Sequence, residues 1–298
     1  MGNDALRVNP SDSDVTINTK GSDWLWAVFA VMLLTNFLMM AWMFTLPKGR
    51  RTFHHMAIFI LTTASIAYFS MASNLGSTPI PVEFNGNREN LTRAIWYVRY
   101  IDWVITTPLL LLELVLATGL PLSDIMALLF FDEVMIITGL VGALVASTYK
   151  WGYFAFGCAA LIYIWVILLG PALKSSGTLG PDFKKAYLLS AAYLSFIWML
   201  YPIAWGLSDG ANVISPDSEM IFYGILDILA KPVFTAWHVY QISRLDYTKM
   251  QLQSGKYSEG AAMVRENELH NVNNTALKNA RADATASGRF SEATAREV

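Results

Sequence analysis

Seven long apolar segments constrain this chain more than any other feature. Each has about 20 residues or more, the length that an α-helix needs to cross a bilayer, and together they comprise residues 24–46, 54–75, 94–117, 122–146, 151–173, 186–207 and 219–242. The composition agrees, because 54% of the 298 residues are hydrophobic and only 15% are charged, whereas soluble domains have about 25% charged residues. The connections are mostly short, so the pattern predicts an all-α membrane protein, a bundle of seven transmembrane helices.

Basic residues near the segment ends predict the orientation of this bundle. Cytoplasmic loops are enriched in Lys and Arg, so the more basic set of connections should face the cytoplasm. One set contains Lys48, Arg50, Arg51, Lys174, Lys184, Lys185, Arg244 and Lys249, and the opposite set contains Lys20, Arg88, Arg93 and Lys150. We therefore expect the N-terminus outside the cell and the C-terminus in the cytoplasm, with the protein crossing the plasma membrane several times in contact with lipid.

The chain is polar on both sides of the apolar region. Residues 1–22 lack a signal-peptide pattern and predict an extracellular N-terminal segment. Residues 23–242 form the predicted membrane domain. Residues 243–298 are rich in Ala, Ser, Asn, Glu and Arg and predict a flexible cytoplasmic tail, with a marginal helix around 259–284.

Composition argues against several other functions. The single cysteine, Cys158, is incompatible with an internal disulfide framework and with a cysteine-based zinc site, and four histidines make a metal cluster unexpected. A net charge of −2 does not favour a nucleic-acid partner. The 56 residues from 243 to 298 are too few for a catalytic domain, so we do not expect an enzyme.

Ionisable side chains inside the apolar segments are candidates for function, because buried charges are costly and rarely kept without a role. The last segment carries Asp227 and Lys231, which are four residues apart and share one helix face. The third segment carries Arg99, Asp102 and Glu113 along one stripe. Asp102 and Glu113 would be separated by roughly 16 Å along the helix axis.

Two interpretations of these residues remain open. One is a structural network, in which the cations Arg99 and Lys231 balance Asp102 and Asp227. The other is chemical, because a desolvated lysine amine can form a Schiff base with a carbonyl compound. Glu113, surrounded by leucines, should stay protonated, and Asp102, one turn from Arg99, should be ionised. That arrangement would place a proton donor and a proton acceptor on either side of the lysine.

Two further acids, Asp209 and Glu219, lie near the predicted outer side, before and at the start of the last segment. If they are close together, they could share one proton and release it outward. The alternative is a pair of ordinary solvated loop acids.

Motifs around these residues resemble those of microbial (type 1) rhodopsins. Residues 99–103 (Arg-Tyr-Ile-Asp-Trp) and 106–113 (Thr-Thr-Pro-Leu-Leu-Leu-Leu-Glu) are similar to the third helix of that family. Residues 226–231 (Leu-Asp-Ile-Leu-Ala-Lys) are similar to its seventh helix, which bears the retinal-binding lysine. The likeness covers about residues 22–242 and is strongest to fungal rhodopsins, which resemble bacteriorhodopsin.

The resemblance implies all-trans retinal as the cofactor, bound to Lys231 as a protonated Schiff base. It assigns a role to each ionisable residue: Asp102 as proton acceptor and counter-ion, Asp227 as second counter-ion, Glu113 as cytoplasmic proton donor, Arg99 as the mobile charge partner, Thr106 as a hydrogen-bond partner near Asp102, and Asp209 and Glu219 as the proton-release group. The implied retinal site contains Tyr68, Trp103, Thr107, Leu110, Met135, Gly139, Trp198, Tyr201, Pro202 and Trp205. Flat aromatic rings suit a polyene, because they restrict which bond can turn.

The function implied by this resemblance is a light-driven outward proton pump. The alternative is a slow-cycling photosensory receptor of the same fold with an unknown signalling partner, since Glu113 stands where the archaeal pump has Asp and some fungal members with Glu cycle slowly. A G-protein-coupled receptor fits less well, because the third segment lacks an Asp-Arg-Tyr ending and residues 231–234 depart from Asn-Pro-x-x-Tyr. Relatives often form trimers, so a homo-oligomer is also implied.

Two positions depart from the family pattern. Phe154 stands where the family often has Trp, which changes the expected wall of the fifth helix. Pro232 directly follows the lysine and removes a backbone donor, so we expect a kink in the seventh helix at the chromophore.

Overall fold

The computed structural model describes residues 3–86 and 90–252 together with the tail residues 268, 271–272, 275–276 and 279. The helix expected around 259–284 and most of the predicted tail lie outside the described residues. The chain divides into two units, residues 1–45 with 52–250 and residues 46–51 with 251–298. In the described part of the second unit, a 3-10 turn, η1 (Lys48–Arg50), precedes Arg51, which donates a hydrogen bond to the Leu46 carbonyl. The first unit contains the helix bundle.

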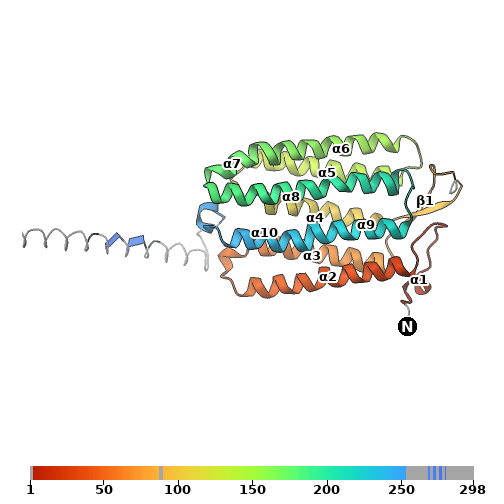
Figure 1. The fold of residues 1–298 in the computed structure, drawn as a ribbon, viewed down its shortest axis with the longest axis horizontal. Helices are drawn as coiled ribbons and strands as arrows, with labels where there is room; N and C mark the ends of the chain where they lie inside the picture. The colour runs from red at the N-terminus through yellow and green to blue at the C-terminus, as the bar shows by residue number, and fades with distance from the viewer. Residues whose placement is uncertain are drawn as a thin grey trace, which may run out of the picture. The chain divides into compact units, whose positions relative to one another are not determined.

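The described part of the bundle contains seven long helical rods. They are α2 (Thr19–Phe44), α3 (Thr52–Ala72), α4 (Tyr97–Val115), α5 (Leu122–Leu144), α6 (Lys150–Ile167) continued by η2 (Leu168–Ala172) and α7 (Leu173–Thr178), α8 (Pro181–Trp205) continued by η3 (Gly206–Gly210), and α9 (Pro216–Ile228) continued by η4 (Leu229–Val233) and α10 (Phe234–Ser243). Successive rods pack side by side, and α9 packs on α2, which closes the ring (Figure 1). The predicted all-helical bundle is therefore confirmed.

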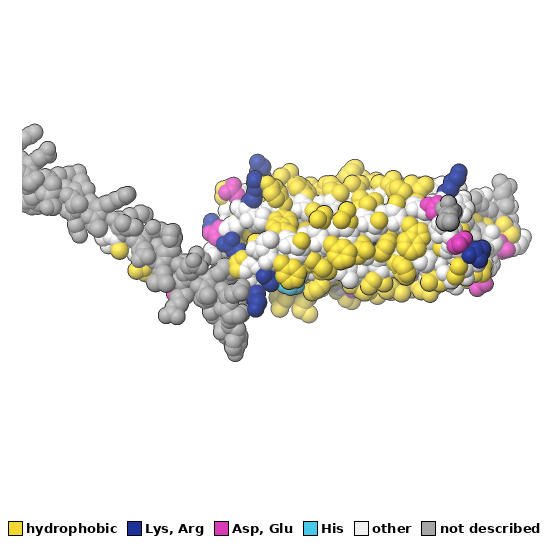
Figure 2. Space-filling view, turned by 90° about the horizontal axis from the view of Figure 1, so that it is seen from below, with side chains coloured by type: hydrophobic (Ala, Val, Ile, Leu, Met, Phe, Trp, Pro, Cys, Tyr) yellow, Lys and Arg dark blue, Asp and Glu magenta, His cyan; other side chains and the backbone are white. Residues whose placement is uncertain are grey.

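The exposed side chains of the bundle indicate that it is surrounded by lipid. Large apolar side chains such as Leu34, Phe37 and Leu38 on α2 are 56–61% exposed. The face shown in Figure 2 is largely hydrophobic along the rods, and the charged side chains gather near the rod ends. Soluble monomers rarely expose apolar patches of that extent. Six rods are long and apolar enough to cross a membrane, and the remaining rod, α4, carries Arg99, Asp102 and Glu113. The protein is thus a multi-pass membrane protein.

A two-stranded hairpin corrects the predicted start of the third segment. Strand β1 (Thr78–Pro81) pairs antiparallel with β2 (Thr92–Ile95), with Thr78 opposite Ile95, so the third helix begins at Tyr97 and not at residue 94. The apolar residues at the end of β2 are buried by strand pairing, which a hydropathy pattern does not distinguish from a helix end. The all-α expectation holds for the bundle but not for this connection.

The N-terminal segment is tied to this hairpin. It contains a single short helix among its described residues, α1 (Ala5–Val8). The Val15 amide donates to the Thr92 carbonyl at 2.9 Å, and the Ala94 amide donates to the Val15 carbonyl at 3.0 Å. The Asp14 carboxylate accepts hydrogen bonds from the Thr92 amide and hydroxyl, which lower the pKa of Asp14. This segment leads directly into α2, which begins five residues earlier than the predicted segment.

Three of the rods contain a π-helical turn, and η4 includes the lysine predicted to be functional. Pro232 within η4 has no N–H group to donate, so regular α-helical hydrogen bonding is interrupted here. The Thr235 hydroxyl donates to the Lys231 carbonyl at 2.6 Å. Wide turns of this kind occur frequently at functional sites. The structure thus has a widened turn at Lys231 and Pro232, where a kink was predicted.

Candidate functional site

A buried lysine and two buried carboxylates form the centre of the bundle. Lys231 Nζ lies 2.5 Å from Asp102 Oδ2 and 3.3 Å from Asp227 Oδ2. The three side chains are at most 1% exposed. Asp227 and Lys231 are one helical turn apart, whereas Asp102 reaches the lysine from α4. A lysine in this interior needs an anion beside it, because an unpaired buried charge is very costly.

The two aspartates differ in their other hydrogen bonds. Asp227 accepts from the Tyr68 hydroxyl at 2.7 Å and from the Tyr201 hydroxyl at 2.6 Å. Hydrogen bonds to a carboxylate favour its charged form. Asp102 Oδ1 has no hydrogen-bond partner in the described part of the chain, and the Thr106 hydroxyl donates to the Asp102 backbone carbonyl at 2.8 Å. Asp102 is consequently the aspartate with the freer carboxylate.

Arg99 does not join the lysine cluster, and this corrects the expected four-charge group. Its Nη1 donates to Glu219 Oε1 at 2.7 Å, and its guanidinium lies over the Tyr223 ring at 4.1 Å. Arg93 Nη2 donates to Glu219 Oε2 at 2.7 Å. Glu219 is therefore held between two arginines. The Arg99 side chain therefore pairs with Glu219 near the start of α9 and not with Asp102, which is one turn further along α4.

Asp209 and Glu219 are both buried but have separate partners. The Tyr100 hydroxyl donates to Asp209 Oδ2 at 2.6 Å, and Lys150 Nζ donates to the Asp209 backbone carbonyl at 3.0 Å. Within the described residues, no hydrogen bond joins the two carboxyl groups, so direct sharing of one proton is not seen. Neither acid is the solvated loop residue that was the alternative interpretation.

Sequence reasoning missed three members of this outer cluster. Arg93 and Lys150 stand at the ends of apolar segments and resemble ordinary loop cations, yet they are 1% and 2% exposed. Tyr100 resembles any aromatic residue of a membrane helix. The adjacency of both cations to apolar runs is the only signal that was available.

Glu113 lies alone in the opposite half of α4. It is fully buried, and neither carboxyl oxygen has a hydrogen-bond partner among the described residues. Surrounding leucines include Leu110, Leu111 and Leu114, which belong to the apolar core. A carboxyl group in such surroundings is most stable in its neutral form. The structure thus places one unpaired acid about 16 Å along the helix from Asp102.

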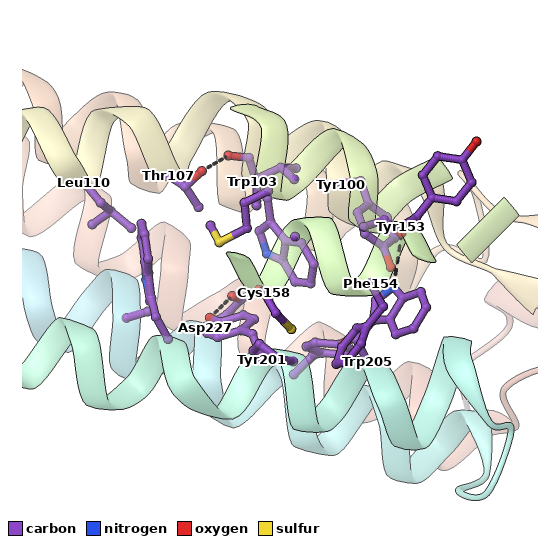
Figure 3. A pocket seen from close by; sticks show the side chains of 18 of the residues that line it. Tyr100, Trp103, Thr107, Leu110, Tyr153, Phe154, Cys158, Tyr201, Trp205 and Asp227 are labelled. Atoms are coloured by element: carbon purple, nitrogen blue, oxygen red, sulfur yellow. Dashed lines mark hydrogen bonds between the residues drawn. The ribbon is translucent and has the colours of Figure 1, made fainter. Parts of the chain in front are cut away.

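A pocket opens beside the lysine and is lined mainly by apolar and aromatic side chains. It has a volume of about 740 Å³, its open mouth included, which lies within the roughly 300–1,000 Å³ of small-molecule sites. Its lining contains all of the predicted retinal-site residues except Tyr68: Trp103, Thr107, Leu110, Met135, Gly139, Trp198, Tyr201, Pro202 and Trp205, together with Lys231. Trp103 and Thr107 face Tyr201 and Trp205 across it (Figure 3).

The pocket is also lined by Asp227, the predicted second counter-ion, and by Phe154. The remaining lining residues were not predicted for the pocket: Tyr100, Ile136, Tyr153, Gly157, Cys158, Tyr223 and Ala230. Phe154, the departure from the family pattern, stacks on Trp205 with ring centroids 5.0 Å apart. Thr107 also donates to Asp132 Oδ2 at 2.8 Å, which ties α4 to α5 at the pocket wall. The apolar lining and the single amine suit a long apolar ligand with a terminal carbonyl, as retinal is.

The fold and the site together define a class of protein. It is a seven-helix membrane protein in which a lysine at the wall of an aromatic pocket is held by two carboxylates, and further buried acids lie toward both ends of the bundle. Such a site is suited to a covalently held carbonyl ligand and to proton movement along the bundle.

Comparison with known proteins agrees with this class. A family model for bacteriorhodopsin-like proteins matches residues 20–245. Protein FDD123 of Trametes versicolor is 54% identical over 88% of this chain and 92% of its own length. Opsin-like protein carO of Fusarium fujikuroi is 48% identical over 84% of each chain. The crystal structure of the light-driven proton pump LR (Mac) from Leptosphaeria maculans superposes with a TM-score of 0.74 at 35% identity, covering 78% of this chain and 99% of that one.

The chain belongs to the microbial (type 1) rhodopsin family and is similar to its fungal members. Proteins of this family bind retinal.

Proposed function

We propose that this protein is a light-driven proton pump that carries protons outward across the plasma membrane, with residues 1–22 outside and the tail in the cytoplasm. The observation that carries the proposal is the contact of Lys231 with Asp102, whose second carboxyl oxygen has no hydrogen-bond partner among the described residues and can take a proton. The solved relative from Leptosphaeria maculans is itself described as a light-driven proton pump, which supports the same function here.

Lys231 would hold retinal, in its all-trans form, within the pocket between Trp103, Trp198 and Trp205. When bound, retinal supplies a light-driven change of shape next to a nitrogen that carries a proton. The lysine Nζ of the present structure stands in for that nitrogen. The aromatic walls orient the ligand and exclude water, and the neighbouring carboxylates balance the positive charge.

Asp102 is the proposed proton acceptor, and Asp227 the proposed permanent counter-ion. Both lie within ion-pair distance of Nζ, but Tyr68 and Tyr201 stabilise the carboxylate form of Asp227 alone. A proton leaving the lysine nitrogen therefore binds more readily to Asp102. Thr106 fixes the backbone of this residue through its hydrogen bond to the Asp102 carbonyl.

Release on the outer side is assigned to the cluster around Asp209 and Glu219. Glu219 has both oxygens paired with arginines, so it stays ionised and anchors Arg99. Asp209 has one oxygen bonded to Tyr100 and the other without a partner among the described residues. We assign the released proton to Asp209. We expect Arg99, which pairs with Glu219 and lies three residues before Asp102 on α4, to transmit the change in charge at Asp102.

Glu113 is the proposed donor that returns a proton to the lysine nitrogen from the cytoplasmic half. Its burial without any partner among the described residues keeps Glu113 protonated until the Lys231 nitrogen has lost its proton. The donor and the acceptor then lie on opposite sides of the lysine, which gives transport its direction.

Light-induced pH change in a suspension of cells expressing the full chain with added all-trans retinal tests this proposal. Illumination should acidify the medium, a protonophore should abolish the change, and both Lys231→Ala and Asp102→Asn should remove it. Asp124→Asn, a change at the first turn of α5 outside the residues that line the pocket, serves as the matched control and should pump normally. A coloured pigment that leaves the pH unchanged would reject the pump in favour of the photosensory alternative. Absence of any pigment in the unmodified chain would reject retinal binding.

A further inference from the structure

The carboxyl group of Glu113 is shut off from solvent in this structure. Glu113 is fully buried, and neither carboxyl oxygen has a hydrogen-bond partner among the described residues. It is also not among the residues that line the pocket beside Lys231. A donor that is emptied in each cycle has to be refilled from solvent. Some part of the protein must therefore move to admit water to Glu113.

A short turn after α10 has one face buried against the bundle. This 3-10 turn, η5 (Tyr247–Met250), follows α10 after a short connection. Tyr247 is 5% and Met250 8% exposed, whereas Thr248 and Lys249 are exposed. Side chains three residues apart lie above one another in a 3-10 helix. Tyr247 and Met250 thus form a single apolar face that is turned toward the protein.

Aromatic contacts locate this face near Glu113. Tyr247 meets Phe53 of α3 edge-on, with ring centroids 6.2 Å apart. Phe53 in turn meets His238 edge-on at 6.3 Å, and His238 Nε2 lies 3.1 Å from the backbone carbonyl oxygen of Glu113. These contacts give the position of the turn and are not a route for a proton. Since Glu219 lies in the first turn of the rod that ends before η5, the turn is at the end opposite the release cluster.

Hydrogen bonds within the turn permit it to move as one piece. Asp246 Oδ1 accepts from the Thr248 amide at 3.1 Å and from the Thr248 hydroxyl at 2.6 Å. The Lys249 amide donates to the Asp246 carbonyl at 3.2 Å. All three bonds stay intact if the turn swings away from the bundle. Residues 244–246, between α10 and η5, are the hinge, because a few residues at the end of an element commonly absorb such a motion.

We propose that η5 is a lid over the cytoplasmic entry to Glu113. The inference rests on the proposed function of Glu113 as donor. When the lid is closed, as in this structure, its apolar face keeps water away from the donor. When it swings out, Tyr247 leaves Phe53 and water reaches Glu113. One proton then passes from water to the Glu113 carboxylate, and the hydroxide ion left behind is neutralised in the cytoplasm. Closing the lid again keeps the donor from losing this proton to the side from which it came.

Hydrogen–deuterium exchange of the Glu113 carboxyl group measures how often the lid opens. The purified, retinal-loaded full chain is kept in the dark in D₂O for increasing times, and a light-induced infrared difference spectrum then shows whether the Glu113 carboxyl band has shifted. The band is assigned by its absence in Glu113→Gln. Burial of one large apolar side chain changes an equilibrium by about tenfold or more. Exchange in Tyr247→Ala should therefore be at least about tenfold faster.

Two further variants separate a lid from other effects of the substitution. Tyr247→Phe keeps the ring that packs on Phe53, so exchange should have the rate of the unmodified chain. Tyr149→Ala removes a tyrosine that is 82% exposed, just before α6, and should also leave the rate unchanged. The temperature at which the pigment loses its colour should be the same in Tyr247→Ala, because the lid is remote from the retinal pocket residues and opens locally.

An unchanged exchange rate in Tyr247→Ala would overturn the lid, as would equal acceleration in Tyr149→Ala. Faster exchange together with a lower temperature of colour loss would also overturn it, since general loosening would then be the cause. If Tyr247→Ala forms no pigment, Met250→Ala provides the second variant and must accelerate exchange as well; a normal rate there would reject the proposal. Failure of the proposed function is distinguishable, because it appears as absent acidification by the unmodified chain, whereas exchange is measured without transport.

Discussion

Single residues in this interior behave differently because their partners differ. Glu219 and Glu113 are both fully buried glutamates, but Glu219 accepts hydrogen bonds from two guanidinium groups, whereas Glu113 has no partner for its carboxyl oxygens among the described residues. A buried acid between cations is held as an anion, and a buried acid among leucines is held neutral. Residue type and burial alone would not distinguish Glu219, which anchors two arginines, from Glu113, the proposed proton donor.

Removing the charge of Glu219 should destabilise the protein strongly. Glu219→Gln leaves Arg93 and Arg99 buried without their anion, and breaking a buried ion pair in this way costs about 3–5 kcal/mol. The measurement is the temperature at which the purified pigment loses its colour. Asp217→Asn on the same helix is the matched control, since Asp217 accepts hydrogen bonds from the exposed Asn18 and has no ion pair in the described part of the chain. Equal stability of the two variants would contradict the anchoring role.

At the scale of elements, close contacts between helices hold the site in register. Rods α2 and α9 approach at Gly224, where an added Cβ would overlap the indole nitrogen of Trp24 and lie 3.1 Å from Val28 Cγ2. The Trp24 indole donates to the Met220 carbonyl at 3.0 Å. This contact closes the ring of helices just before the rod reaches Asp227.

Gly224→Ala should therefore loosen the closure of the ring. Overpacking of this kind costs about 1–3 kcal/mol, more than the roughly 0.8–1.0 kcal/mol that Ala gains over Gly in a helix. Thermal loss of the pigment is again the measurement. At Gly152 on α6 an added Cβ meets nothing within 4 Å, so Gly152→Ala should leave stability unchanged or raise it. A stable Gly224→Ala variant would show that Trp24 moves aside without cost.

At the scale of the whole molecule, the proposed direction of transport depends on which end faces the cytoplasm. The bundle has one end with the hairpin, the N-terminal segment and the cluster of Asp209 and Glu219, and another end with His238 and Gln241. The excess of Lys and Arg in the connections at the second end predicts that this end is cytoplasmic.

Thiol labelling of intact cells tests this orientation. In a Cys158→Ser background, Asp12→Cys should react with a membrane-impermeant reagent from outside, because Asp12 is an exposed residue of the N-terminal segment. Thr178→Cys, at the exposed end of α7, should react only after permeabilisation. The reverse pattern would invert the topology and, with it, the proposed direction of pumping.

Much of this architecture follows from patterns within single segments. Stretches of about 20 apolar residues identify the membrane class, and the helical repeat places Asp227 and Lys231 on one face. The motifs around them identify the rhodopsin family and about half of the residues that line the pocket. The hairpin was missed because a short apolar strand and a helix end have the same hydropathy.

Contacts between segments were decided only by the tertiary structure. Arg99 pairs with Glu219 and not with Asp102, Arg93 and Lys150 are buried, and His238 reaches the backbone of Glu113. These pairings depend on the rotation and axial position of each helix relative to its neighbours, which side-chain packing sets. The sequence by itself thus determined the membrane class, the seven helices and the placement of Lys231 and Asp227 on one helix face. Packing decided which buried charges meet, since that choice involves residues more than a hundred positions apart.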